Sequence, residues 1–155
     1  MTKGTEPGKS QSFMELALAE AEAAGERGEV PVGAVIVRGS EVIARVGNRM
    51  VELKDPSAHA ELLAIRQACL ALDNARLEGC DLYVTLEPCA MCAAAISFAR
   101  IRRLYYGASD KKGGAVEHGP RFFAQPTCHH APEVYGGIDE VRSADLLKAF
   151  FAARR

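Results

Sequence analysis

Two short segments of this chain carry residue types that can bind a metal ion and move protons. They are His59-Ala60-Glu61 and Pro88-Cys89-Ala90-Met91-Cys92. Two thiolates and one neutral imidazole suit Zn²⁺, and three protein ligands leave the fourth tetrahedral position free for water. The pattern predicts one hydrolytic zinc centre, beside which the carboxylate of Glu61 acts as catalytic acid and base. The predicted metal ligands are His59, Cys89 and Cys92.

The spacing of these residues restricts the local structure that can bring them together. Cys89 and Cys92 lie three apart at the start of a predicted helix, so their side chains share one face. The partial positive charge of a helix N-terminus favours the thiolate form, which is the form that binds metal. Glu61 follows His59 by two residues, a step that turns a helical side chain by roughly 200°. We therefore expect His59 to lie before the regular helix or in an irregular first turn.

Other interpretations of the two cysteines are open at this point. A Cys-x-x-Cys pair can be a redox pair, although such a pair is expected in a thioredoxin-like setting without a His-x-Glu partner. A closed structural zinc site would need a fourth ligand. The candidates for that ligand are Cys69, Cys80, Cys128, His129 and His130. Cys69 lies on the apolar face of a predicted helix and Cys80 precedes a predicted strand, so both are more simply core residues.

The composition is that of a globular protein without an overall bias towards one kind of partner. The 155 residues are 48% hydrophobic and 25% charged, and the net charge is −1, which fits one domain with its own core. We expect no membrane span and no secretory signal. Because the five cysteines include the two of the metal motif, a reducing cytoplasm is favoured over a disulfide framework. A cluster of cations after the cysteines could hold phosphates, although clustering alone favours solvated surface charges. These cations are Arg100, Arg102, Arg103, Lys111, Lys112 and Arg121.

The hydrophobic pattern predicts a flexible tail over residues 1–11 and one layered α/β domain over residues 12–155. The predicted helices are residues 12–24, residues 58–72, residues 88–99 and a final helix near the C-terminus. The predicted strands are residues 32–37, 41–48, 82–86, 103–106 and 133–136. Ser57 is expected to cap the second helix. The helix over 88–99 is apolar nearly all round, so we expect it to be buried on all sides.

The motifs are similar to those of zinc-dependent nucleobase deaminases, whose signature is H-x-E followed by P-C-x-x-C. Within this cytidine/deoxycytidylate deaminase-like superfamily, the chain resembles the bacterial tRNA-specific adenosine deaminases, which convert the wobble adenosine of an anticodon to inosine. The similarity extends over nearly everything after residue 12. The similar segments are 29–34, Asn48, 59–61, 83–92, 107–115 and the C-terminal Phe150, Phe151, Arg154 and Arg155.

The resemblance also implies a fold, partners and further site residues. It implies a single three-layer α/β domain, in which helices cover both faces of a five-stranded mixed sheet. It also implies one Zn²⁺ per subunit, a homodimer whose subunits both shape each active site, and a tRNA anticodon stem-loop as substrate. Asn48 and the backbone of Ala60 would contact the target nucleotide, and Asp110 would bind the sugar of a neighbouring one. Val30 and Lys112 are the remaining implied substrate contacts.

Two other functions are compatible with the same residues. One is a zinc-dependent deaminase of a free nucleobase or nucleoside, such as guanine or cytosine, because the metal chemistry would be shared. Asp110 and the basic residues around it argue against this function, since a small base would not need them. The other is a catalytically silent RNA-binding subunit with a structural zinc, although such a protein could dispense with Glu61.

Overall fold

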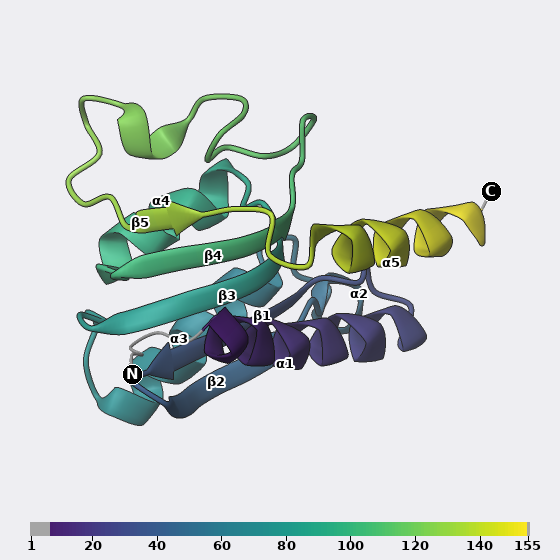
Figure 1. Ribbon diagram of the computed structural model, residues 1–155, viewed down its shortest axis with the longest axis horizontal. Helices are drawn as coiled ribbons and strands as arrows, with labels where there is room; N and C mark the ends of the chain where they lie inside the picture. The colour runs from purple at the N-terminus through teal and green to yellow at the C-terminus, as the bar shows by residue number, and fades with distance from the viewer. Residues whose placement is uncertain (1–6, 155) are drawn as a thin grey trace.

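Five strands form one mixed sheet at the centre of the molecule (Figure 1). The computed structural model describes the backbone of residues 7–154 and the side chains of residues 12–154. The strands are β1 (Gly33–Arg38), β2 (Glu41–Gly47), β3 (Cys80–Leu86), β4 (Arg103–Ala108) and β5 (Glu133–Tyr135). They lie in the order β2-β1-β3-β4-β5. β1 is antiparallel to both of its neighbours, whereas β3, β4 and β5 run parallel, so the predicted mixed sheet is confirmed.

Helices cover both faces of this sheet. They are α1 (Pro7–Glu26), the short α2 (Met50–Leu53), α3 (Ala60–Leu72), α4 (Ala90–Ala99), the 3₁₀ helix η1 (Phe122–Ala124) and α5 (Glu140–Ala152). α1 and α5 pack on one face of the sheet, and α3 and α4 lie on the other (Figure 1). The predicted three-layer α/β architecture is therefore confirmed. None of the helices in the described part of the chain is long and apolar enough to cross a membrane.

The interior strand β1 shows why both layers are needed. Its side chains alternate between the two faces, as strand geometry requires. Ala34 and Ile36 belong to the hydrophobic cluster beneath α3, while Val35 and Val37 belong to the cluster beneath α1. All four side chains are buried. The continuous apolar run in the sequence therefore reflects a strand that is covered on both faces.

The first helix begins earlier than the sequence pattern predicts. α1 starts at Pro7 instead of residue 12, so residues 7–11 of the expected tail are helical. Proline is well tolerated in a first helical turn, because the N–H that it lacks has no partner there. Residues 1–6 of the expected tail lie outside the described residues.

The second predicted helix begins later than expected, and its predicted cap is wrong. α3 starts at Ala60, with His59 in the N-cap position and no side-chain cap hydrogen bond. Ser57 lies too far from the helix start to cap it. Its hydroxyl donates instead to Oδ1 of Asp55 at 2.7 Å, and its backbone N–H donates to the same oxygen at 2.9 Å. A local turn therefore competes successfully for the serine.

The expectation that residues 88–99 form a helix buried on all sides is also wrong. α4 begins at Ala90, and its inward face is buried at Cys92, Ala93 and Ile96. On its other face, Phe98 is 72% exposed and Met91 is 37% exposed. One side of an almost entirely apolar helix is therefore bare in the single chain.

Candidate active site and metal centre

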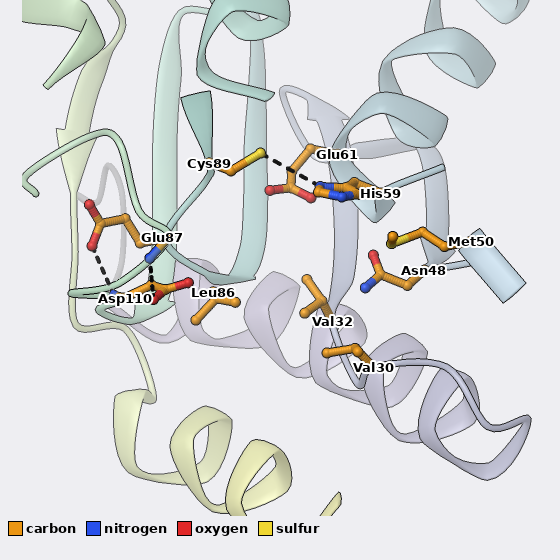
Figure 2. A pocket seen from close by; sticks show the side chains of 11 residues that line it. Val30, Val32, Asn48, Met50, His59, Glu61, Leu86, Glu87, Cys89 and Asp110 are labelled. Carbon is orange, nitrogen blue, oxygen red and sulfur yellow. Dashed lines mark hydrogen bonds between the residues drawn. The ribbon is translucent and has the colours of Figure 1, made fainter. Parts of the chain in front are cut away.

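A pocket of about 300 Å³ lies where β3 ends and where α3 and α4 begin (Figure 2). Ligand sites in α/β sheets commonly occur outside the carboxyl ends of strands, and here the end of β3 leads directly to the cysteine motif. The side chains lining the pocket are those of Val30, Val32, Asn48, Met50, His59, Glu61, Leu86, Glu87, Cys89 and Asp110, together with Gly113.

The three predicted metal ligands converge on one point at the pocket wall, which His59 and Cys89 line while Cys92 lies buried behind it. Nδ1 of His59 lies 3.5 Å from Sγ of Cys92 and 3.7 Å from Sγ of Cys89. All three donor atoms lie within 4.8 Å of one another. Ordinary Zn–S and Zn–N lengths at a tetrahedral angle place sulfur and nitrogen about 3.5 Å apart. The spacing and the chemical softness of the donors therefore both fit Zn²⁺.

The local backbone explains how both helix ends present ligands to one point. His59 has φ −74° and ψ 150°, and Cys89 has φ −75° and ψ 177°, so both are extended N-cap residues that precede a regular helix. The expectation for His59 is therefore confirmed. Glu61 belongs to the first turn of α3, and its carboxyl group lies beside His59 and Cys89 (Figure 2).

Within the described residues, the metal-ligating group contains three side chains and no fourth one. None of the five alternative fourth ligands belongs to this group, and four of them have other contacts. Cys80 is buried in the main hydrophobic cluster, and Cys69 packs against that cluster. Cys128 lies 3.6 Å from the Ser97 hydroxyl, and Nε2 of His130 lies 2.7 Å from a backbone oxygen. The arrangement is that of an open zinc site and not of a closed structural one.

His59, Cys89 and Cys92 together form the metal cradle. Its two cysteines differ in the pKa of their thiols. The hydrogen bond from the Cys92 thiol lowers the pKa of Cys89 to about 4, and the contact with His59 acts in the same direction. The same hydrogen bond and burial raise the pKa of Cys92. The Cys89 thiol is therefore the more readily ionised of the two, and a thiol that becomes a zinc ligand releases its proton.

Glu61 is a buried carboxyl group that is not among the metal ligands. It is 5% exposed, and burial raises its pKa to about 7. A group with a pKa near the working pH can both accept and donate a proton, which is the property that acid–base catalysis needs.

Asn48 and Ala60 are joined by a hydrogen bond that fixes the Asn48 amide. Oδ1 of Asn48 accepts the backbone N–H of Ala60 at 2.8 Å. Its Nδ2 group is therefore the end that remains available, and no described residue accepts a hydrogen bond from it. The Ala60 N–H is itself occupied, so Ala60 orients Asn48 and does not present a free donor to the pocket.

The other two predicted contacts differ in position. Val30 lines the pocket. The exposed side chain of Lys112 is not part of the lining. The Lys112 backbone N–H instead donates to Oδ1 of Asp110 at 3.1 Å, and that of Gly113 donates to the same oxygen at 2.9 Å. Asp110 lines the pocket and closes this turn.

Sequence reasoning missed several residues that build the pocket. Glu87 is buried and accepts hydrogen bonds from the segment that follows Asp110. Burial opposes its ionisation, but the Asp110 N–H, the His118 ring and further backbone N–H groups hold its pKa below the usual value. The sequence signal that could have identified Glu87 is its position between an apolar strand and the metal motif. Met50 is brought to the pocket by Glu29, whose carboxylate accepts two N–H groups of α2.

Residues 7–108 match the family described as the cytidine and deoxycytidylate deaminase zinc-binding region. The matched segment contains all three donors of the cradle and Glu61. The chain therefore belongs to this family of zinc-binding deaminases.

Comparison with individual proteins shows which members of this family the chain is similar to. The chain is 68% identical over 143 residues to a tRNA-specific adenosine deaminase of Agrobacterium fabrum, covering 92% of this chain and 94% of that one. A solved structure of a tRNA:A34 deaminase that edits adenosine to inosine at the wobble position has 70% identity and a TM-score of 0.87. It covers 88% of this chain and 99% of its own. A guanine deaminase structure from Bacillus subtilis has 32% identity and a TM-score of 0.64, covering 93% of this chain and 92% of its own. The predicted resemblance to tRNA-specific adenosine deaminases is confirmed.

Removing one of the three metal ligands should abolish tight metal binding without unfolding the chain. We expect Cys92→Ser to lose most of its zinc, because a neutral hydroxyl replaces a thiolate in a site with only three protein ligands. Metal content per subunit, measured by plasma mass spectrometry, checks this. Cys128→Ser is the matched control and should keep one zinc. Equal zinc content in both variants would contradict the assignment of the cradle.

Proposed function

We propose that this chain hydrolytically deaminates adenosine to inosine at the wobble position of a tRNA anticodon, with one zinc ion per subunit. The observation that carries the proposal is the open His59, Cys89 and Cys92 cradle with the buried Glu61 carboxyl beside it. The 68% identity to a protein named tRNA-specific adenosine deaminase supports the choice of substrate. Because tRNA is its substrate, we place the protein in the cytoplasm.

The residues of the pocket divide the reaction between them. A zinc ion in the cradle would supply a water activated at neutral pH, because three-ligand zinc lowers the pKa of bound water to about 7. Glu61 accepts a proton from the attacking water and passes it to the ring nitrogen of adenine. Glu61 then takes the remaining proton from the newly added hydroxyl group and delivers it to the departing amine. Water and adenosine are thereby converted to inosine and ammonia.

The remaining lining residues orient the base. Val30, Val32 and Leu86 lie across the pocket from the metal cradle and provide apolar surface for a planar ring (Figure 2). Asn48 offers its Nδ2 donor to a ring acceptor, because its oxygen is held by Ala60. An anticodon loop presents its bases single-stranded, which lowers the cost of moving one into such a pocket.

The two rival functions are less well supported. A guanine deaminase is a solved relative, but its identity of 32% is less than half of the 70% shared with the tRNA:A34 deaminase. A silent RNA-binding subunit would have no use for Glu61. Burying an ionisable carboxyl without a function would only cost stability.

The activity can be tested with a synthetic anticodon stem-loop that carries adenosine at the wobble position. We expect the wild-type protein to form inosine, detected by mass spectrometry, and to release no ammonia from free guanine or cytosine. Glu61→Gln should retain zinc and lose activity by about 10²–10⁴-fold, because proton transfer is lost. Glu41→Gln, on the exposed part of β2, is the control. Near-normal turnover by Glu61→Gln would show that the assigned role is wrong.

Asp110 has one carboxylate oxygen that can serve the nucleotide beside the target. Oδ1 accepts two backbone N–H groups and holds the turn. No described residue donates to Oδ2, which can therefore accept the 2′-hydroxyl of a neighbouring ribose.

Asp110→Asn separates these two tasks. The asparagine oxygen can keep the turn, while its amide replaces the free acceptor with a donor. We expect the variant to lose about 5- to 20-fold of the preference for ribose over deoxyribose at the neighbouring position. Deamination rates of paired stem-loops that differ only in that sugar measure the preference. An unchanged preference would contradict the role of Asp110.

The bare face of α4 supports the proposed homodimer. Phe98 and Met91 expose large apolar side chains on a helix whose opposite face is buried. Pairing of two such faces would remove them from water. Met91 directly precedes the ligand Cys92, so a partner on this face would lie close to the metal centre.

Phe98→Glu should weaken this association, because pairing would bury an unpaired charge. We expect the wild-type protein to have the mass of a dimer in sedimentation equilibrium and Phe98→Glu to shift towards the monomer. Val141→Glu adds the same charge at a 70% exposed position on α5 and should remain a dimer. A monomeric wild-type protein would refute the proposed dimer.

A further inference from the structure

The buried carboxylate of Glu87 lies at the centre of the loop that carries Asp110. Its Oε1 accepts the backbone N–H of Asp110 at 3.0 Å and contacts Nδ1 of His118 at 2.7 Å. Its Oε2 accepts the backbone N–H groups of Val116, Glu117 and His118 at 3.1, 2.9 and 3.1 Å. One side chain therefore receives donors from both ends of the segment 110–118.

This arrangement specifies the loop conformation strongly. The side chain of Glu87 is fully buried, and an ionised carboxylate removed from water is costly unless donors replace the lost hydration. Here the donors come almost entirely from the backbone of one loop. If the loop moved away, the charge would remain buried without partners. The loop and the carboxylate therefore hold each other in place.

Glu87 also links this loop to the metal cradle through the backbone. It lies two residues before Cys89, and its own N–H donates to the carbonyl of Ala108 at 2.9 Å. The carbonyl of Pro88 accepts the N–H of Ala115 at 2.8 Å. One short segment therefore carries a metal ligand and anchors both ends of the loop that places Asp110 at the pocket (Figure 2).

The packing around Gly114 shows how closely the loop approaches Glu87. A Cβ atom at this position would lie 2.5 Å from Cδ of Glu87 and 2.5 Å from the backbone oxygen of Asp110. Real Cβ contacts are not found at such distances. Only glycine at position 114 lets the backbone wrap the carboxylate.

We propose that Glu87 is a positioning residue for recognition of the nucleotide beside the target, and that it acts through Asp110. This inference rests on the proposed function, since it concerns how the RNA is held. Glu87 does not touch the reacting base in this assignment. It fixes where the Asp110 carboxylate stands relative to the metal cradle.

Glu87→Gln is the central variant, because its amide would face backbone N–H groups where a carboxylate oxygen now accepts them. We expect KM for the anticodon stem-loop to rise at least about tenfold, while kcat stays within about threefold and zinc content is unchanged. Adding Asp110→Asn should cause no further rise in KM, because both changes remove one contact. Glu78→Gln, at an exposed position ahead of β3, is the matched control and should leave KM unchanged.

A purely structural role would give a different pattern. The effects of Glu87→Gln and Asp110→Asn would then multiply, or kcat would fall with KM unchanged, and either result overturns the inference. Wild-type KM for Glu87→Gln overturns it as well.

Amide hydrogen exchange provides a readout that needs no RNA. In Glu87→Gln, the amides of Asp110, Val116, Glu117 and His118 should exchange faster than in the wild-type protein, while those of β3 should not. Unchanged exchange overturns the inference even when the deaminase activity is present. If the wild-type protein failed to deaminate the stem-loop, the proposed function would fall, and with it the inference about RNA.

If Glu87→Gln does not give folded protein by circular dichroism, Gly114→Ala takes its place. Its methyl group would push the loop away from Glu87, so the same rise in KM and the same lack of additivity with Asp110→Asn are expected. A normal KM for Gly114→Ala would overturn the inference.

Discussion

The active site depends on the extended backbone at two helix starts. His59 and Cys89 each stand one residue before a regular helix, and this directs their side chains to a common point instead of along the helix surface. Without that conformation, the two-residue step from His59 to Glu61 would separate the ligand from the carboxyl group. The sheet makes the convergence possible, because β3 delivers the chain to the metal motif at the edge where α3 begins.

Burial then gives these groups their chemical properties. Glu61 titrates near neutrality because it is removed from water, and Cys89 ionises readily because Cys92 and His59 donate towards it. Glu87 shows the opposite outcome of burial. It stays ionised because a loop surrounds it with donors. The pKa values of these three acidic groups therefore differ according to the hydrogen-bond donors that replace the water lost on burial.

The chemistry could be predicted from the sequence better than the contacts that organise it. The metal ligands could be predicted from their residue types and short spacing. The strand covered on both faces could be predicted from its continuous apolar run. The serine cap failed because Asp55, two residues earlier, binds Ser57 in a local turn. The apolar face of α4 was misjudged because hydrophobicity shows that a surface avoids water, not what covers it. Glu87 was missed because its partners lie 23 to 31 residues later in the chain.

The layer formed by α1 and α5 contributes no side chain to the lining of the pocket. The residues that line the pocket come from the opposite layer and from the loops at the strand ends. Substitutions in α1 and α5 therefore reach the pocket only by way of the sheet between them. For an engineer, that half of the molecule is the place to raise thermal tolerance without altering the lining of the pocket.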